Sequence, residues 1–87
     1  MVEMSFPEII VYGTTRCPDC RRTESFLRSR GVPFEYRDVE AEGLGDEVIR
    51  LNEEAGYGAR RRVPTLLIGG LTYSVPSNAE LSQALGL

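Results

Sequence analysis

The sequence contains no histidine and no lysine, and these two absences exclude several kinds of catalytic site. Without imidazole there is no Ser-His-Asp triad and no histidine-ligated metal site. All ten basic residues are arginines, so no lysine is present to form a Schiff base or to act as a general base. The nucleophiles that remain are thiols, hydroxyls and carboxylates.

Positive charge and long apolar segments are also scarce. The formal net charge is −3, whereas phosphate backbones bind to cationic faces, so nucleic acid is not an expected partner. No segment approaches the roughly 20 apolar residues that span a bilayer, and no membrane association is expected. Residues 1–8 lack the basic and apolar stretches of a signal peptide. We therefore expect a cytoplasmic protein, in which paired cysteines are usually catalytic or metal-binding.

The chain is short enough that residues 1–87 are expected to form one domain with one small core. Hydrophobic periodicity, glycines and prolines predict seven elements in the order βαβαββα. They are a strand at 8–12, a helix from Pro18 that ends at Gly31, a strand at 33–39, a helix at 46–55, strands at 64–68 and 71–74 joined by a Gly69-Gly70 turn, and a helix that begins at Pro76-Ser77. The first two strands should be parallel, since a helix joins them, and the last two should form a hairpin. The fold class is α/β.

One motif carries a chemical mechanism, the C-x-x-C formed by Cys17, Pro18, Asp19 and Cys20. It follows a predicted strand and opens a predicted helix, so the two sulfurs should lie one helical turn apart and could cycle between dithiol and disulfide. The unpaired backbone N–H groups and the positive dipole end of the helix favour a thiolate at Cys17.

Charged neighbours act on that thiolate in both directions. Arg16, Arg21 and Arg22 add positive potential, while Asp19 opposes them. We expect the three guanidinium groups and the backbone N–H groups to outweigh the single carboxylate.

Three other interpretations of the cysteine pair are open. A structural zinc site needs four ligands, and the sequence has no third cysteine and no histidine, so a single chain could not complete one. A structural disulfide would close only a four-residue loop, which stabilises by roughly 2 kcal/mol against nearly 5 kcal/mol for a long loop. Chance spacing fits poorly with the strand–turn–helix context. A redox-active pair is the favoured interpretation.

A second motif is Val63-Pro64-Thr65, directly before the third predicted strand. Proline is common at the first position of a strand, which is the simplest explanation. The alternative is a cis peptide bond before Pro64 that presents the backbone N–H and C=O of Val63 to the cysteines.

Together, the segments YGTTRCPDC, RRRVPT, GG and SVPSNAEL resemble the glutaredoxin family, and among its members the mycoredoxin-like proteins of bacteria. The resemblance extends over most of the chain. It implies a thioredoxin-like fold with a four-stranded mixed sheet flanked by three helices, and a cis bond before Pro64.

The resemblance also implies roles for individual residues. Cys17 would be the exposed nucleophile and Cys20 the resolving thiol. A low-molecular-weight thiol would lie along Val63 and Pro64, toward the turn that carries Ser77 and Asn78. The run of arginines at 60–62 is either a solvated loop or, through Arg62 and with Arg16, a receptor for a carboxylate of that thiol.

The expected function is therefore that of a dithiol glutaredoxin-like oxidoreductase, which reduces protein disulfides and mixed disulfides with glutathione, mycothiol or bacillithiol as reductant. It would act as a monomer, without a tightly bound cofactor or metal, on oxidised proteins, and a flavoprotein reductase is a candidate partner. One rival function is electron donation to ribonucleotide reductase, with reduction by thioredoxin reductase. The other is a non-enzymatic metal or iron–sulfur carrier that bridges two chains through Cys17.

Overall fold

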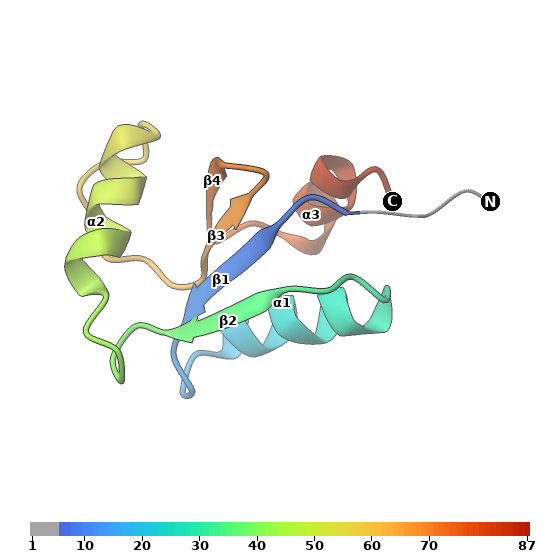
Figure 1. The fold of residues 1–87 in the computed structure, drawn as a ribbon, viewed down its shortest axis with the longest axis horizontal. Coiled ribbons are helices and arrows are strands. Elements are labelled where there is room, and N and C mark those ends of the chain that lie inside the picture. The colour runs from blue at the N-terminus through green and yellow to red at the C-terminus, as the bar shows by residue number, and fades with distance from the viewer. Residues whose placement is uncertain (1–5) are drawn as a thin grey trace.

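The structure is a computed structural model, and it describes residues 6–87. The observed order of elements confirms the βαβαββα prediction: β1 (Ile9–Gly13), α1 (Pro18–Ser29), β2 (Glu35–Asp38), α2 (Gly45–Glu54), β3 (Thr65–Ile68), β4 (Leu71–Ser74) and α3 (Asn78–Leu85) (Figure 1). The expectation that no signal peptide is present rests partly on residues 1–5, which lie outside the described residues. No helix within residues 6–87 has the length and apolar character needed to cross a membrane.

The four strands form one mixed sheet in the order β2-β1-β3-β4. β1 pairs with β2 in parallel and with β3 antiparallel, and β3 and β4 form the expected hairpin. Gly69 and Gly70 both have positive φ, at 57° and 86°, as a two-residue turn between twisted antiparallel strands requires. Because β1 is flanked on both sides, the loop at its carboxyl end emerges from the middle of the sheet.

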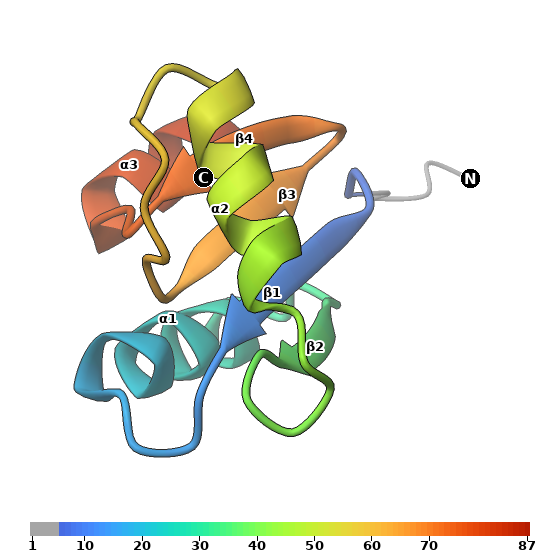
Figure 2. The same cartoon turned by 90° about the vertical axis from the view of Figure 1, so that its left-hand side faces the viewer.

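Alternation along β1 divides the core into two layers. Ile9 and Val11 pack on one face with Leu27 of α1 and Leu81 of α3. On the other face, Tyr12 packs with residues that include Val48 of α2, and Ile10 lies partly buried against this cluster. Figure 2 accordingly shows α2 on one side of the sheet, with α1 and α3 on the other. The sheet is therefore covered on both faces, and the fold is the thioredoxin-like arrangement expected from the sequence.

Several predicted boundaries shift by one or two residues for identifiable reasons. β2 is shorter than the predicted 33–39, because Pro33 has no backbone N–H to contribute to a ladder. For the same reason β3 begins after Pro64. α2 runs from Gly45 to Glu54 instead of over 46–55, and the exposed Ala55 caps its carboxyl end. Gly31 follows α1 with a φ of 68°, which confirms the left-handed residue predicted there.

Candidate active site

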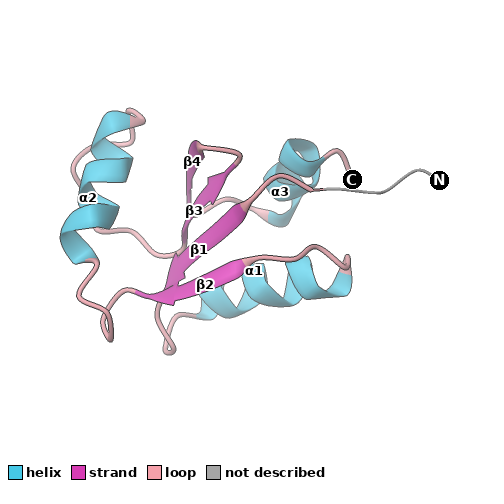
Figure 3. Ribbon diagram, viewed as in Figure 1, coloured by secondary structure: helices cyan, strands magenta, loops and turns pink. Residues whose placement is uncertain are grey.

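A loop joins β1 to α1 (Figure 3). Cys17 lies at its end and is the N-cap residue of α1. Its Sγ accepts a hydrogen bond from the backbone N–H of Cys20 at 3.2 Å. Pro18 occupies the first helical position, where its missing N–H leaves no partner unsatisfied. Cys17 is half-buried, and both cysteines are free. The sulfur is thus held at the positive end of α1 while remaining open to solvent.

Cys20 occupies the opposite environment, since it is fully buried one turn further along α1. Burial, followed by a hydrogen bond with Cys17, raises the pKa of the Cys20 thiol to about 12. Its Sγ lies over Gly13, the last residue of β1: a Cβ atom on Gly13 would be 3.0 Å from that sulfur and 3.2 Å from the Tyr36 ring. Gly13 therefore gives the second thiol the space it occupies, a role that the sequence analysis did not foresee.

Val63 reaches the site from the other side. Its carbonyl oxygen lies 3.6 Å from Cys17 Sγ and accepts a hydrogen bond from the thiol. The Val63–Pro64 peptide bond is cis, as predicted. The carbonyl of Pro64 in turn accepts from the backbone N–H of Val75 at 2.8 Å. Val75 has a φ of 46°, a conformation that is strained for a β-branched residue, and this segment leads from β4 into α3.

A buried amide fixes the loop that precedes Val63. Asn52 of α2 is fully buried, and its Nδ2 donates to Thr65 Oγ1 at 3.0 Å and to the carbonyl of Arg60 at 3.2 Å. Thr65 Oγ1 donates to the carbonyl of Arg62 at 2.7 Å. Asn52 and Thr65 were not foreseen as positioning residues, although a polar residue within an apolar stripe is the signal that could have identified Asn52.

Arg22 ties α1 to the start of α3. Its guanidinium donates to Asn78 Oδ1 at 2.7 Å and to the carbonyl of Pro76 at 3.0 Å. Ser77 is the N-cap of α3: its hydroxyl accepts from the backbone N–H of Glu80 at 3.1 Å, and the Glu80 carboxylate accepts from the backbone N–H of Ser77. Ser77 and Asn78, expected to contact a thiol ligand, therefore also make bonds within the protein. Both remain exposed.

The remaining predicted residues lie on two sides of Cys17. Arg62 is exposed next to Val63, on the side of the cis-proline. Arg16 is also exposed, and with Pro18 and Arg21 it lines a hollow of about 460 Å³ beside the first turn of α1. The structure thus brings Cys17, Cys20, Val63 and Pro64 together directly. It places the two arginines on separate segments around them.

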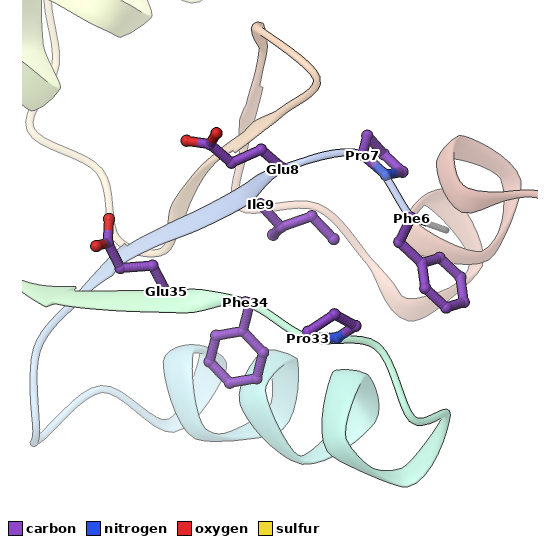
Figure 4. Close-up of a pocket in the computed structure, with 7 residues that line it drawn as sticks. All are labelled: Phe6, Pro7, Glu8, Ile9, Pro33, Phe34 and Glu35. Atoms are coloured by element: carbon purple, nitrogen blue, oxygen red, sulfur yellow. The ribbon is translucent and has the colours of Figure 1, made fainter. Parts of the chain in front are cut away.

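A second hollow, of about 420 Å³, lies at the amino ends of β1 and β2, whereas Cys17 follows the carboxyl end of β1. Figure 4 shows the Phe34 ring directed toward α1 and the carboxylates of Glu8 and Glu35 directed the other way. The residues that line this hollow include no cysteine; they are Phe6, Pro7, Glu8, Ile9, Pro33, Phe34 and Glu35. This hollow is therefore separate from the cysteine pair.

The geometry supports one kind of chemistry, the exchange of a disulfide. An accessible sulfur at a helix N-terminus can attack a disulfide, and a buried sulfur one turn away can displace the product. Within residues 6–87, no cluster of three or more histidine, cysteine, aspartate or glutamate side chains is placed to hold a metal ion.

Comparison with known proteins agrees with this geometry. A family model described as Glutaredoxin matches residues 9–72. No curated protein sequence matches the chain. A glutaredoxin from Methanosarcina mazei is similar in structure, with a TM-score of 0.72, 26% identity, and coverage of 97% of this chain and 85% of the other. A glutaredoxin from Archaeoglobus fulgidus gives a TM-score of 0.71 at 25% identity, over 90% of this chain and 85% of the other. A poplar glutaredoxin, 19% identical over 88% of this chain and 72% of its own with a TM-score of 0.64, shares the fold.

Proposed function

The chain belongs to the glutaredoxin family, and from that premise we propose that it is a dithiol enzyme reducing both protein disulfides and mixed disulfides with a low-molecular-weight thiol. The family carries thiol-disulfide oxidoreductase activity. The proposal adds the dithiol route and the two classes of substrate.

The observation that supports it most is the contrast between the two thiols on one helical turn. Cys17 Sγ is half-buried and accepts the Cys20 N–H bond at 3.2 Å, while Cys20 itself is fully buried. A substrate disulfide can therefore reach only Cys17. Cys17 thiolate attacks one sulfur of the substrate and the other leaves as a thiolate, which takes up a proton. Cys20 then loses its proton and attacks Cys17, which releases the first substrate sulfur and leaves a Cys17–Cys20 disulfide.

A low-molecular-weight thiol would return the enzyme to the dithiol state, and glutathione, mycothiol and bacillithiol are the candidates. We expect it to lie along Val63 and Pro64, with Arg62, joined by Arg16, receiving its carboxylate, and with Ser77 and Asn78 at the start of α3 contacting its other end. A flavoprotein reductase would regenerate that thiol. Turnover coupled to each thiol with its own reductase would identify the reductant and would test the mycoredoxin-like assignment.

Replacing each cysteine by serine tests the division of roles. Cys17→Ser should abolish reduction of a protein disulfide and of a small-thiol adduct, since no accessible thiol remains. Cys20→Ser should abolish reduction of the protein disulfide but retain part of the activity on the adduct, because a second small thiol can resolve the mixed disulfide. Initial rates on both substrates measure the effect. Activity that persists in Cys17→Ser would show that the roles are assigned wrongly.

A further inference from the structure

One hollow is lined by Arg16, Pro18 and Arg21, of which only Arg16 has a place in the function proposed above. It measures about 460 Å³ and lies beside Cys17, because Arg16 precedes that cysteine and Pro18 and Arg21 lie on the first turn of α1. Cys20, on the same turn, is directed into the protein instead. Val63 and the start of α3, where we place the thiol ligand, do not line this hollow.

Its two guanidinium groups form no ion pair with an acidic side chain of residues 6–87. The ion pairs of the described chain involve Arg22, Arg28 and Arg37, and neither Arg16 nor Arg21 takes part in one. Arg21 donates only to the backbone carbonyl of Thr15, at 3.0 Å. This bond holds the guanidinium group near the loop that carries Arg16.

The nearest acidic residue in sequence does not cancel this charge. Asp19 lies between the two cysteines, but its carboxylate is 3.6 Å from Arg22, and Asp19 does not line the hollow. Two cations are thus left open to solvent next to the nucleophile of a chain whose net charge is −3. An anionic group of the substrate is the chemical complement of such a surface.

We propose that this hollow receives an aspartate or glutamate side chain of a polypeptide whose disulfide Cys17 attacks, so that disulfides with acidic neighbours are preferred substrates. The inference rests on the proposed function. It differs from recognition of a small thiol, which is proposed to lie along Val63 and in which Arg21 has no part. Exposed ion pairs favour binding by small amounts, so the preference should be about threefold and should shrink as salt is added.

Two disulfide-cyclised peptides test the preference, one with aspartate on both sides of one cysteine and the other with asparagine at the same positions. The pre-reduced protein is mixed with each peptide, and appearance of the peptide dithiol gives the single-turnover rate without any external reductant. Two electrons and two protons pass from Cys17 and Cys20 to the peptide, and the protein becomes the disulfide. We expect the aspartate peptide to react about three times faster.

Removal of one cation identifies the site. Arg21→Gln should reduce the ratio of the two rates toward one, and the double variant with Arg16→Gln should abolish the preference. Arg50→Gln removes the same charge from an exposed position on α2 and should leave the ratio unchanged. Because the ratio is taken within each variant, a loss of folded protein cancels.

The outcomes separate this inference from the proposed function. If the wild-type protein reduces both peptides equally, the docking inference is wrong while the proposed function stands. If it reduces neither peptide, both are wrong. A third measurement uses a glutathione adduct of a neutral peptide, which Arg21→Gln should reduce at the wild-type rate. An equal loss on the adduct and on the aspartate peptide would assign the hollow to the carboxylate of the small thiol and overturn the inference.

Discussion

The starts of α1 and α3 make the same hydrogen bond with different atoms. At α1, Cys17 Sγ accepts from the backbone N–H of Cys20 at 3.2 Å, and at α3, Ser77 Oγ accepts from that of Glu80 at 3.1 Å. In both cases a side chain at the N-cap satisfies a donor that the helix leaves free. The residue three positions further on differs. Glu80 returns its carboxylate to the Ser77 backbone, whereas Cys20 directs its sulfur into the core.

This difference separates a structural cap from a reactive one. The start of α3 is a capping box, in which the side chains of Ser77 and Glu80 each accept a hydrogen bond from the backbone N–H of the other residue. The α1 start leaves Cys17 with no carboxylate bonded to it and with a second thiol behind it. Arg22 of α1 donates hydrogen bonds to Asn78 and Pro76, and these bonds connect the start of α3 to the helix that begins at Cys17. We infer that α3 braces the site.

The largest expected effect is the pH dependence of the exchange reaction, because Cys20, the third residue of α1, carries a titratable thiol. Burial is the largest of the causes that raise the pKa of Cys20 in the dithiol, and it also acts in the mixed disulfide, so the Cys20 thiol is protonated at neutral pH and the reactive thiolate increases as the pH rises. The rate at which Cys20 resolves a mixed disulfide at Cys17 should therefore rise about tenfold per pH unit between pH 6 and 9, and fall equally as the pH is lowered.

Rapid-quench single turnovers, which follow release of the first substrate thiol, measure this step. The Cys20→Ser variant, which cannot release that thiol internally, is the control. A rate that levels off near pH 8 would show that the thiol ionises far more easily in the mixed disulfide than in the dithiol.

Gly13→Ala should produce the next largest effect, because it fills the space into which the α1 start directs Cys20. The new Cβ would lie 3.0 Å from Cys20 Sγ and 3.3 Å from its Cβ, and overpacking of this kind costs about 1–3 kcal/mol of unfolding free energy. We expect reduction of protein disulfides to fall about tenfold, while reduction of small-thiol adducts, which needs only Cys17, changes less.

Gly45→Ala is the matched control, since its Cβ would make only ordinary contacts, 3.5 Å from Arg61, at the start of α2. Thermal unfolding and the two activities should be measured on both variants. Equal losses on the two substrates would mean that Gly13 supports the site as a whole and does not position Cys20 alone.

Much of the fold could be predicted because its signals are local. The C-x-x-C before a helix, the proline before a strand, the two glycines of the hairpin and Gly31 each act on the backbone within a few residues, and all appear where expected. The carboxyl end of β2, at Asp38 instead of Val39, was less predictable, since it depends on where its partner strand β1 ends, at Gly13.

The supporting parts of the site could not be predicted because they depend on contacts between distant segments. Asn52 reaches Thr65 across 13 positions, and Arg22 reaches Asn78 across 56. Val75 is a further case, since its positive φ runs against the preference of a β-branched residue and no sequence pattern indicates it. Local patterns thus identified the two thiols, and tertiary packing determined what holds them in place.

The smallest expected effect compares the two caps directly. Ser77→Ala removes the oxygen that accepts from Glu80 and should lower the free energy of unfolding by about 1 kcal/mol, whereas Ser77→Gly should cost only a few tenths. Cys17→Ser, which we expect to be inactive, keeps an acceptor at the N-cap of α1 and should unfold at or above the wild-type temperature. Thermal unfolding of the three variants measures all of these changes. A marked loss of stability in Cys17→Ser would show that the sulfur stabilises the helix start in a way that oxygen cannot, so the two starts would not share a common cap.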